Sequence, residues 1–195
     1  SRPDEAFGLP GSYTPVMFET YMSTQEFLKP DGSRPPKWDE RSFAQYDKGS
    51  DIRTMHATSK ITVDFDPSKD LEQAFPAKSD KAWLADKEGN LVWYEILVNK
   101  DEYDYIYKNR FYNSMEQYKA AESGTHIDLP LGDLGGQVGA IELKAAWLSV
   151  ENENDAKWNR YKMTKAKVCS YDGVCKIQAF ALVGLHIIHK TTSQA

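Results

Sequence analysis

Three long segments rich in strand-forming residues fill the last third of this 195-residue chain and constrain its fold more than any other feature. They cover residues 139–150, 160–169 and 175–191. An acidic, Asn-rich stretch separates the first two, and the Asp172-Gly173 dipeptide, a strong signal for a hairpin turn, separates the last two. The sequence therefore predicts three consecutive antiparallel strands that form a C-terminal meander. Residues 179–188 are apolar on both faces, which predicts a central strand covered on both sides.

Further strands are expected upstream of these segments. Apolar and polar residues alternate over residues 61–65, as in a half-buried strand. Residues 83–86 and 91–98 flank a Gly-Asn pair suited to a hairpin loop, and residues 16–21 have the composition of a strand.

Two or three short helices are expected between residues 23 and 122. A capping box, Ser23 followed by Glu26, opens the first. Asn99 is the expected N-cap of a helix over residues 100–109, and a third helix covers residues 114–121. The predicted fold is a single α+β domain, mainly antiparallel β-sheet, with a loop-rich opening segment at 1–60 and a sheet-forming core at 61–195.

Composition excludes several classes of protein. The net charge of −5 and the pI near 5.4 argue against a surface that neutralises phosphates, so we expect no nucleic-acid partner. No apolar run approaches the roughly 20 residues that span a bilayer, so membrane insertion is not expected. The chain begins at Ser1 without a positively charged, apolar leader, so a signal peptide is either already removed or never existed.

The chain contains two cysteines, Cys169 and Cys175, on either side of the predicted Asp-Gly turn. They can face each other across the hairpin, and a bridge there stabilises the fold by about 2 kcal/mol in the chain-entropy model. Such a bridge persists only in an oxidising compartment, so we expect a periplasmic or secreted protein. Two unpaired thiols are the alternative.

Polar side chains on apolar strands are the main candidates for a site. Strand alternation places Glu142 and Lys144 on one face, where they form either a structural ion pair or a catalytic acid and base. His186 shares a face with Gly184, which leaves room for a ligand, although a core imidazole is the more common role for such a histidine. His186 and His189 point to opposite faces of a strand and cannot easily share one metal ion, yet a single bound ion is not excluded.

Other motifs favour structural roles. The glycines between residues 132 and 139 open a strand and not a helix, so they form an adaptable loop and not a phosphate cradle. Asp64 and Asp66 can act as paired carboxylates but lie before Pro67, at an exposed strand end. The five Trp and eleven Tyr either fill a core or stack on sugars.

Residues 93–106, 139–147 and 182–191, about a sixth of the chain, resemble a family of exported bacterial proteins of unknown activity that is loosely associated with c-type cytochromes. The resemblance implies export. It also implies a longer protein, with more aromatic sequence after the counterpart of Thr191, of which this chain is one fragment. It does not imply haem, because the chain contains no Cys-x-x-Cys-His.

We therefore expect an exported binding or assembly domain, without a predicted cofactor, that contacts other protein segments or subunits. One alternative is an enzyme in which Glu142, Lys144 and His186 act as acid and base on a small polar or carbohydrate substrate. The other is a carbohydrate-binding module with exposed Trp and Tyr. A shared cleft favours the enzyme, a coplanar exposed aromatic row favours the module, and neither favours the assembly domain.

Overall fold

The computed structural model describes residues 16–40, 53–55, 86–88, 90, 92–169 and 175–192. Its strands are, in chain order, β1 (Met22–Ser23), β2 (Arg53–Met55), β3 (Val92–Val98), β4 (Ile141–Val150), β5 (Met163–Cys169) and β6 (Cys175–His189). Its α-helices are α1 (Thr24–Phe27), α3 (Lys100–Lys108) and α4 (Ser114–Glu122). Short 3-10 helices are η1 (Met17–Thr20), η2 (Trp38–Glu40) and η3 (Ala156–Arg160).

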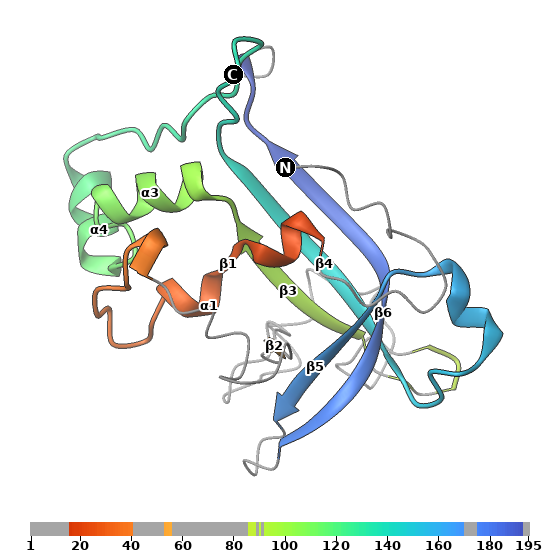
Figure 1. Ribbon diagram of the computed structural model, residues 1–195. Coiled ribbons are helices and arrows are strands. Elements are labelled where there is room, and N and C mark those ends of the chain that lie inside the picture. Colours follow the sequence, from red (N-terminus) through yellow and green to blue (C-terminus); the bar gives the residue numbers. More distant parts are fainter. Residues whose placement is uncertain are drawn as a thin grey trace.

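The strands form one curved sheet in the order β1-β3-β4-β6-β5-β2, with the α-helices to one side of it (Figure 1). Every neighbouring pair is antiparallel except β2 and β5, which are parallel. The expected α+β fold, dominated by an antiparallel sheet, is confirmed.

The order of the last three strands departs from a simple meander, because β6 lies between β4 and β5. The turn between β5 and β6 is short and makes them neighbours. The connection from β4 to β5 is longer and contains η3, so it can pass over the width of one strand. The longest strand, β6, thereby takes a central position.

Local signals account for the two longer helices. The Asn99 Oδ1 atom accepts a hydrogen bond from the Glu102 backbone N–H at 3.1 Å, which caps α3 as expected. The Asn113 Oδ1 atom caps α4 in the same way, by accepting from the Met115 N–H at 2.9 Å. Helix α1 also forms where it was expected, but Ser23 makes no side-chain capping hydrogen bond.

The strand predicted for residues 16–21 is wrong, because η1 occupies most of this segment. Glu19 causes the difference. Its backbone N–H donates to the Val16 carbonyl, its Oε1 atom accepts from the Val16 N–H at 3.2 Å, and its buried carboxylate lies 3.3 Å from the Lys162 Nζ atom. The turn also packs Phe18 against Trp147, with ring centroids 6.4 Å apart.

Three apolar clusters stabilise the described fold. The first surrounds Trp147 and Phe180 on one face of the sheet, and the second surrounds Leu148 and Trp158. The third joins the helices to the end of β3 through Val98 and Tyr103. The first and second clusters lie on the half of β6 that also pairs with β5, and this uneven covering leaves the other half of β6 open.

Several predictions lie outside the described residues: the strand over 61–65, the Asp64 and Asp66 pair, and the first strand of the 83–98 hairpin up to residue 85. Its second strand is β3, preceded by a turn in which the Asp86 N–H donates to the Asn90 carbonyl.

Candidate functional site

Strand β6 is longer than either of its neighbours. Its 15 residues pair with β4 over residues 179–189, but with β5 only over residues 175–181. We refer to residues 183–189 as the β6 overhang. Within the described parts of the chain, no strand pairs with the second edge of the overhang, so β6 is a central strand at one end and an edge strand at the other.

Hydrogen bonding to β4 determines which backbone groups of the overhang remain available. Lys190 donates to the Ala140 carbonyl at 3.0 Å, and the register then pairs His186 with Lys144 and Ile188 with Glu142. In an antiparallel ladder, alternate residues direct their N–H and C=O groups to opposite edges. Leu185 and Ile187 therefore direct theirs to the open edge.

The side chains of the overhang are largely apolar and exposed. Val183, Leu185, Ile187 and Ile188 have between 41% and 57% of their surface accessible. Proteins usually protect such edges with charged residues, prolines or a covering element. The interpretation of residues 179–188 as a strand covered on both faces is therefore wrong beyond Leu182.

A β-bulge marks the start of the overhang. The register passes from Ala146 opposite Gly184 to Trp147 opposite Leu182, so Val183 is the extra residue. A Cβ atom on Gly184 would lie 3.4 Å from the Ala146 Cβ atom, in ordinary contact. Bulges bend a strand and increase its twist, and here the bulge begins the part of β6 that β5 does not follow.

The candidate catalytic residues of the sequence lie on this part of the sheet. Lys144 is directly opposite His186, and Glu142 lies two residues from Lys144 on the same strand, so all three share one face as the enzyme hypothesis requires. The Lys144 Nζ atom lies 4.7 Å from the centroid of the Tyr94 ring, a cation–π contact from the neighbouring strand. His186 is exposed, so its interpretation as a core imidazole is wrong.

Two cavities of the described structure lie beside α3 and between α3 and the 130–138 loop, and none of these three residues lines either of them. Glu142 and Lys144 are partly exposed and His186 is exposed, whereas acid–base catalysis benefits from a cleft that excludes water.

Glu142 has a buried acidic neighbour. Asn99 and Asp101 fasten the start of α3 to β4, since Asn99 accepts from the Ile141 N–H at 3.1 Å and Asp101 accepts from the Gly139 N–H at 2.9 Å. This places Glu102 near Glu142. Burial, and secondarily the charge of Glu142, raise the pKa of Glu102 to about 7.

The glycine loop fits closely against the end of the overhang. A Cβ atom on Gly139, which has φ +77°, would lie 2.2 Å from the Gly132 backbone nitrogen. The His189 Nε2 atom lies 2.6 Å from the Val138 carbonyl oxygen, and Gly132 donates to the Lys190 carbonyl. The loop is thus tightly packed here, which differs from the adaptable loop that its composition suggested.

The β5–β6 register pairs Cys169 with Cys175. Residues directly opposite each other in an antiparallel pair have Cα atoms about 4.5–5.5 Å apart, within the range that a disulfide spans. The predicted bridge is compatible with this register and stays a prediction.

The described residues were also compared with the requirements of a membrane-spanning helix and of a metal site. Within them, no helix is long and apolar enough to cross a membrane. The same part of the chain contains no group of three or more His, Cys, Asp or Glu side chains that could hold a metal ion.

Sequence reasoning missed Leu185 and Ile187 as site residues, because an apolar run suggests a covered strand. The length of the last predicted strand was the available signal. Residues 175–191 form a longer segment than residues 160–169, so a strand there must extend beyond its neighbour.

Fold and site together define a mixed α+β protein whose antiparallel sheet has one long, apolar and unpaired edge among the described residues. No protein-family model matches the chain, and no solved structure matches it. The chain is similar to the RNA polymerase sigma factor SigI3 of Acetivibrio thermocellus, with 33% identity over 106 residues. The match covers 51% of this chain and 42% of the sigma factor, so the chain spans less than half the length of this relative.

Proposed function

We propose that the protein is an exported assembly domain that binds an extended segment of another polypeptide as an additional strand along the β6 overhang. The observation that supports this most directly is that no described strand pairs with the second edge of residues 183–189, whose apolar side chains are exposed. The segment would complete the sheet on the side that β5 leaves open.

Strand addition uses two kinds of contact. Main-chain hydrogen bonds to the open edge supply affinity, and alternate side chains supply specificity. Here the N–H and C=O groups of Leu185 and Ile187 are available for the main-chain hydrogen bonds. The apolar side chains on the two faces of the overhang provide the side-chain contacts, so a partner segment with apolar residues on both faces fits best.

Export is the second part of the proposal. The hairpin register of Cys169 and Cys175 supports it, because a bridge there requires the oxidising environment of the periplasm or the extracellular space. No cofactor is needed for strand addition. The similarity to a sigma factor adds no function, since it covers less than half of that protein.

Amide hydrogen exchange of the full chain, followed by NMR, tests the edge directly. In the free protein the amides of Leu185 and Ile187 should exchange fast, and those of His186 and Ile188 slowly, because the latter pair with β4. A synthetic octapeptide with six central Val residues and a Lys at each end, which is apolar on both faces as a strand, serves as the probe, and the same peptide with a central Pro serves as the control. The first peptide should slow exchange at Leu185 and Ile187, and the second should not.

A matched pair of variants locates the effect. Ile187→Lys introduces a charge at the open edge and should abolish the protection by the peptide. Ile177→Lys changes an equally exposed isoleucine of β6 where β5 already pairs, and should leave the protection intact. Slow exchange at Leu185 in the free, dilute protein would contradict the proposal. Protection that rises with protein concentration alone would assign the edge to a second copy, and would contradict it too.

The enzyme alternative rests on the adjacency of Lys144 and His186, and neither residue lines the cavity beside α3 or the cavity next to the 130–138 loop. The carbohydrate-binding alternative required a coplanar row of exposed aromatic rings. Tyr118 is the one Trp, Tyr or Phe with a largely exposed side chain in the described part of the chain, so no such row is found there.

A further inference from the structure

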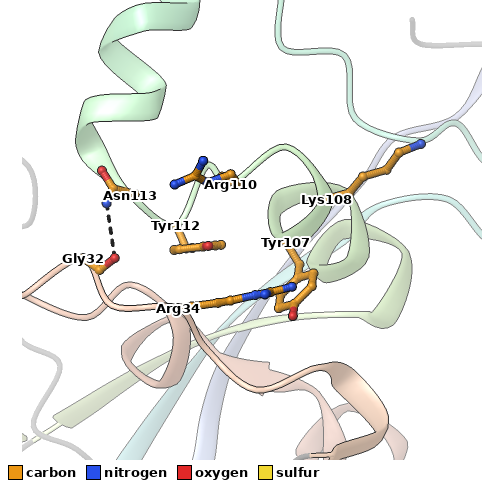
Figure 2. A pocket seen from close by; sticks show the side chains of 7 residues that line it. All are labelled: Gly32, Arg34, Tyr107, Lys108, Arg110, Tyr112 and Asn113. Atoms are coloured by element: carbon orange, nitrogen blue, oxygen red, sulfur yellow. Dashed lines mark hydrogen bonds between the residues drawn. The ribbon is translucent and has the colours of Figure 1, made fainter.

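A cavity of about 510 Å³ lies where the end of α3, the start of α4 and the 32–34 segment meet (Figure 2). Its volume falls in the range of small-ligand sites, about 300–1,000 Å³. It is separate from the β6 overhang, and nothing in the strand-addition proposal depends on it.

Asn113 fastens the two sides of the cavity together. Its Nδ2 atom donates to the Gly32 carbonyl at 3.2 Å, while its Oδ1 atom caps α4. Gly32 has φ +64°, and a Cβ atom there would lie 3.0 Å from the Asn113 Nδ2 atom. A residue without a side chain thus allows the loop to approach α4, so the walls of the cavity are held in place by specific contacts.

Two tyrosine rings form the aromatic part of the wall. Tyr112 is buried, and its ring centroid lies 6.2 Å from that of Tyr107. Tyr107 in turn lies 6.0 Å from the fully buried Tyr103. The rings belong to the apolar cluster between the helices and the end of β3, which fixes their positions.

Two guanidinium groups approach these rings. The Arg34 Cζ atom lies 4.8 Å from the centroid of the Tyr107 ring, a cation–π contact. In Figure 2, Arg110 lies on one side of the Tyr112 ring and Arg34 on the other, whereas the amino group of Lys108 points away from them.

Neither guanidinium group forms an ion pair with a described residue. The charge of Arg110 reaches the carboxylate of Glu116, but that carboxylate accepts a hydrogen bond from the Lys119 Nζ atom at 2.8 Å. In a chain with a net charge of −5, two arginines beside a cavity that form no ion pair with a described residue are a local concentration of positive charge. They retain their bidentate hydrogen-bonding capacity for a ligand.

The backbone of Arg110 gives a second, independent indication. Among the described residues, Arg110 is the one non-glycine residue with a positive φ, +60°. It follows the end of α3, where glycine is the usual residue because it adopts this conformation without steric cost. A strained conformation at a side chain that lines a cavity points to a role for that side chain.

We propose that this cavity binds a small anion with a ring-shaped body. The guanidinium groups of Arg34 and Arg110 hold its carboxylate or phosphate group, and the rings of Tyr107 and Tyr112 contact its ring. Guanidinium groups match both oxyanions in geometry, and aromatic faces suit a sugar or other flat ring. An acidic sugar and a sugar phosphate share this chemistry.

Isothermal titration calorimetry of the full chain at pH 7 distinguishes an acidic sugar from a sugar phosphate as the ligand. The probes are glucuronate, glucose 6-phosphate, neutral glucose and inorganic phosphate. At least one of the acidic sugars should bind, and the tighter one identifies the oxyanion. Glucose should not bind, and inorganic phosphate should bind more weakly than the sugar phosphate. If neither acidic sugar binds at millimolar concentration, or if glucose binds equally well, the proposal is overturned.

Two variants and a control place the ligand. Arg34→Gln and Arg110→Gly should each weaken binding roughly tenfold or more, as expected when a charge-assisted hydrogen bond is lost. Arg110→Gly should not lower the melting temperature, because glycine relieves the positive φ, so lost binding cannot be ascribed to unfolding. Arg160→Gln removes an exposed arginine that contacts Tyr161 elsewhere, and should leave affinity unchanged. Equal weakening by Arg160→Gln would mean non-specific attraction and would overturn the proposal.

Discussion

Glu102 offers a sharp test of the structure because it is a carboxyl group buried without compensation. It is only 6% exposed, and no described residue donates a hydrogen bond to its carboxyl or forms an ion pair with it. Burial is the first cause of its raised pKa, about 7 instead of 4.5, and the charge of Glu142 is the second. Replacing Glu102 by Gln keeps the shape of the side chain and removes its ability to ionise.

The size and sign of the effect follow from linkage. One pKa unit corresponds to 1.36 kcal/mol, so the difference between 4.5 and about 7 corresponds to about 3 kcal/mol. Between these two pH values the folded protein holds a proton at Glu102 that the unfolded chain has released. The free energy of unfolding should therefore fall as pH rises from 4.5 to about 7, and this contribution should be constant above it.

Urea denaturation followed by tryptophan fluorescence, at several pH values from 4.5 to 8, measures this contribution. Glu102→Gln should match the unchanged protein near pH 4.5 and exceed its stability by about 3 kcal/mol at pH 8. Glu142→Gln should lower the pH at which the free energy of unfolding stops falling, because the charge of Glu142 no longer raises the pKa of Glu102. Glu122→Gln, on the exposed surface of α4, is the control and should not alter the pH profile.

One result would refute the reasoning. If Glu102→Gln is less stable than the unchanged protein at pH 8, then the Glu102 carboxylate is ionised and stabilised in the fold.

Three further predictions concern other parts of the molecule. Lys162→Met should lower the free energy of unfolding by about 3–5 kcal/mol in urea denaturation, because it removes the buried ammonium group that lies 3.3 Å from the buried Glu19 carboxylate; the double variant Glu19→Leu/Lys162→Met should recover part of the loss, and no recovery would argue against a buried pair. Titration of the denatured, unreduced protein with a thiol reagent should find no reactive thiol if Cys169 and Cys175 are bridged, and two reactive thiols would show that they are not. His186→Ala should change the free energy of unfolding by less than about 0.5 kcal/mol, because the imidazole is exposed; a clear fall in the melting temperature would restore the core role.

The candidate site was only partly visible from the sequence. Strand alternation correctly placed Glu142 and Lys144 on one face, and it separated His186 from His189. It did not show that Lys144 and His186 are directly opposite, because the register depends on the bulge at Val183 and on where β4 begins. The pair Arg34 and Arg110 carried no signal at all, since the two residues are far apart in the sequence.

The sequence by itself determined the features that depend on near neighbours. Helices α3 and α4 begin at asparagine caps, because the asparagine side chain satisfies a backbone N–H two or three residues further on. Strands β5 and β6 are antiparallel neighbours, as the sequence pattern predicts, while the predicted Asp172-Gly173 turn lies outside the described residues. Only the tertiary structure decided the order β4-β6-β5, the burial of Glu102 and the exposure of the β6 overhang. Each of these depends on which distant segments lie beside a residue. An apolar residue in a strand is compatible with either a covered or an open position, and the length and placement of the neighbouring strands select between them.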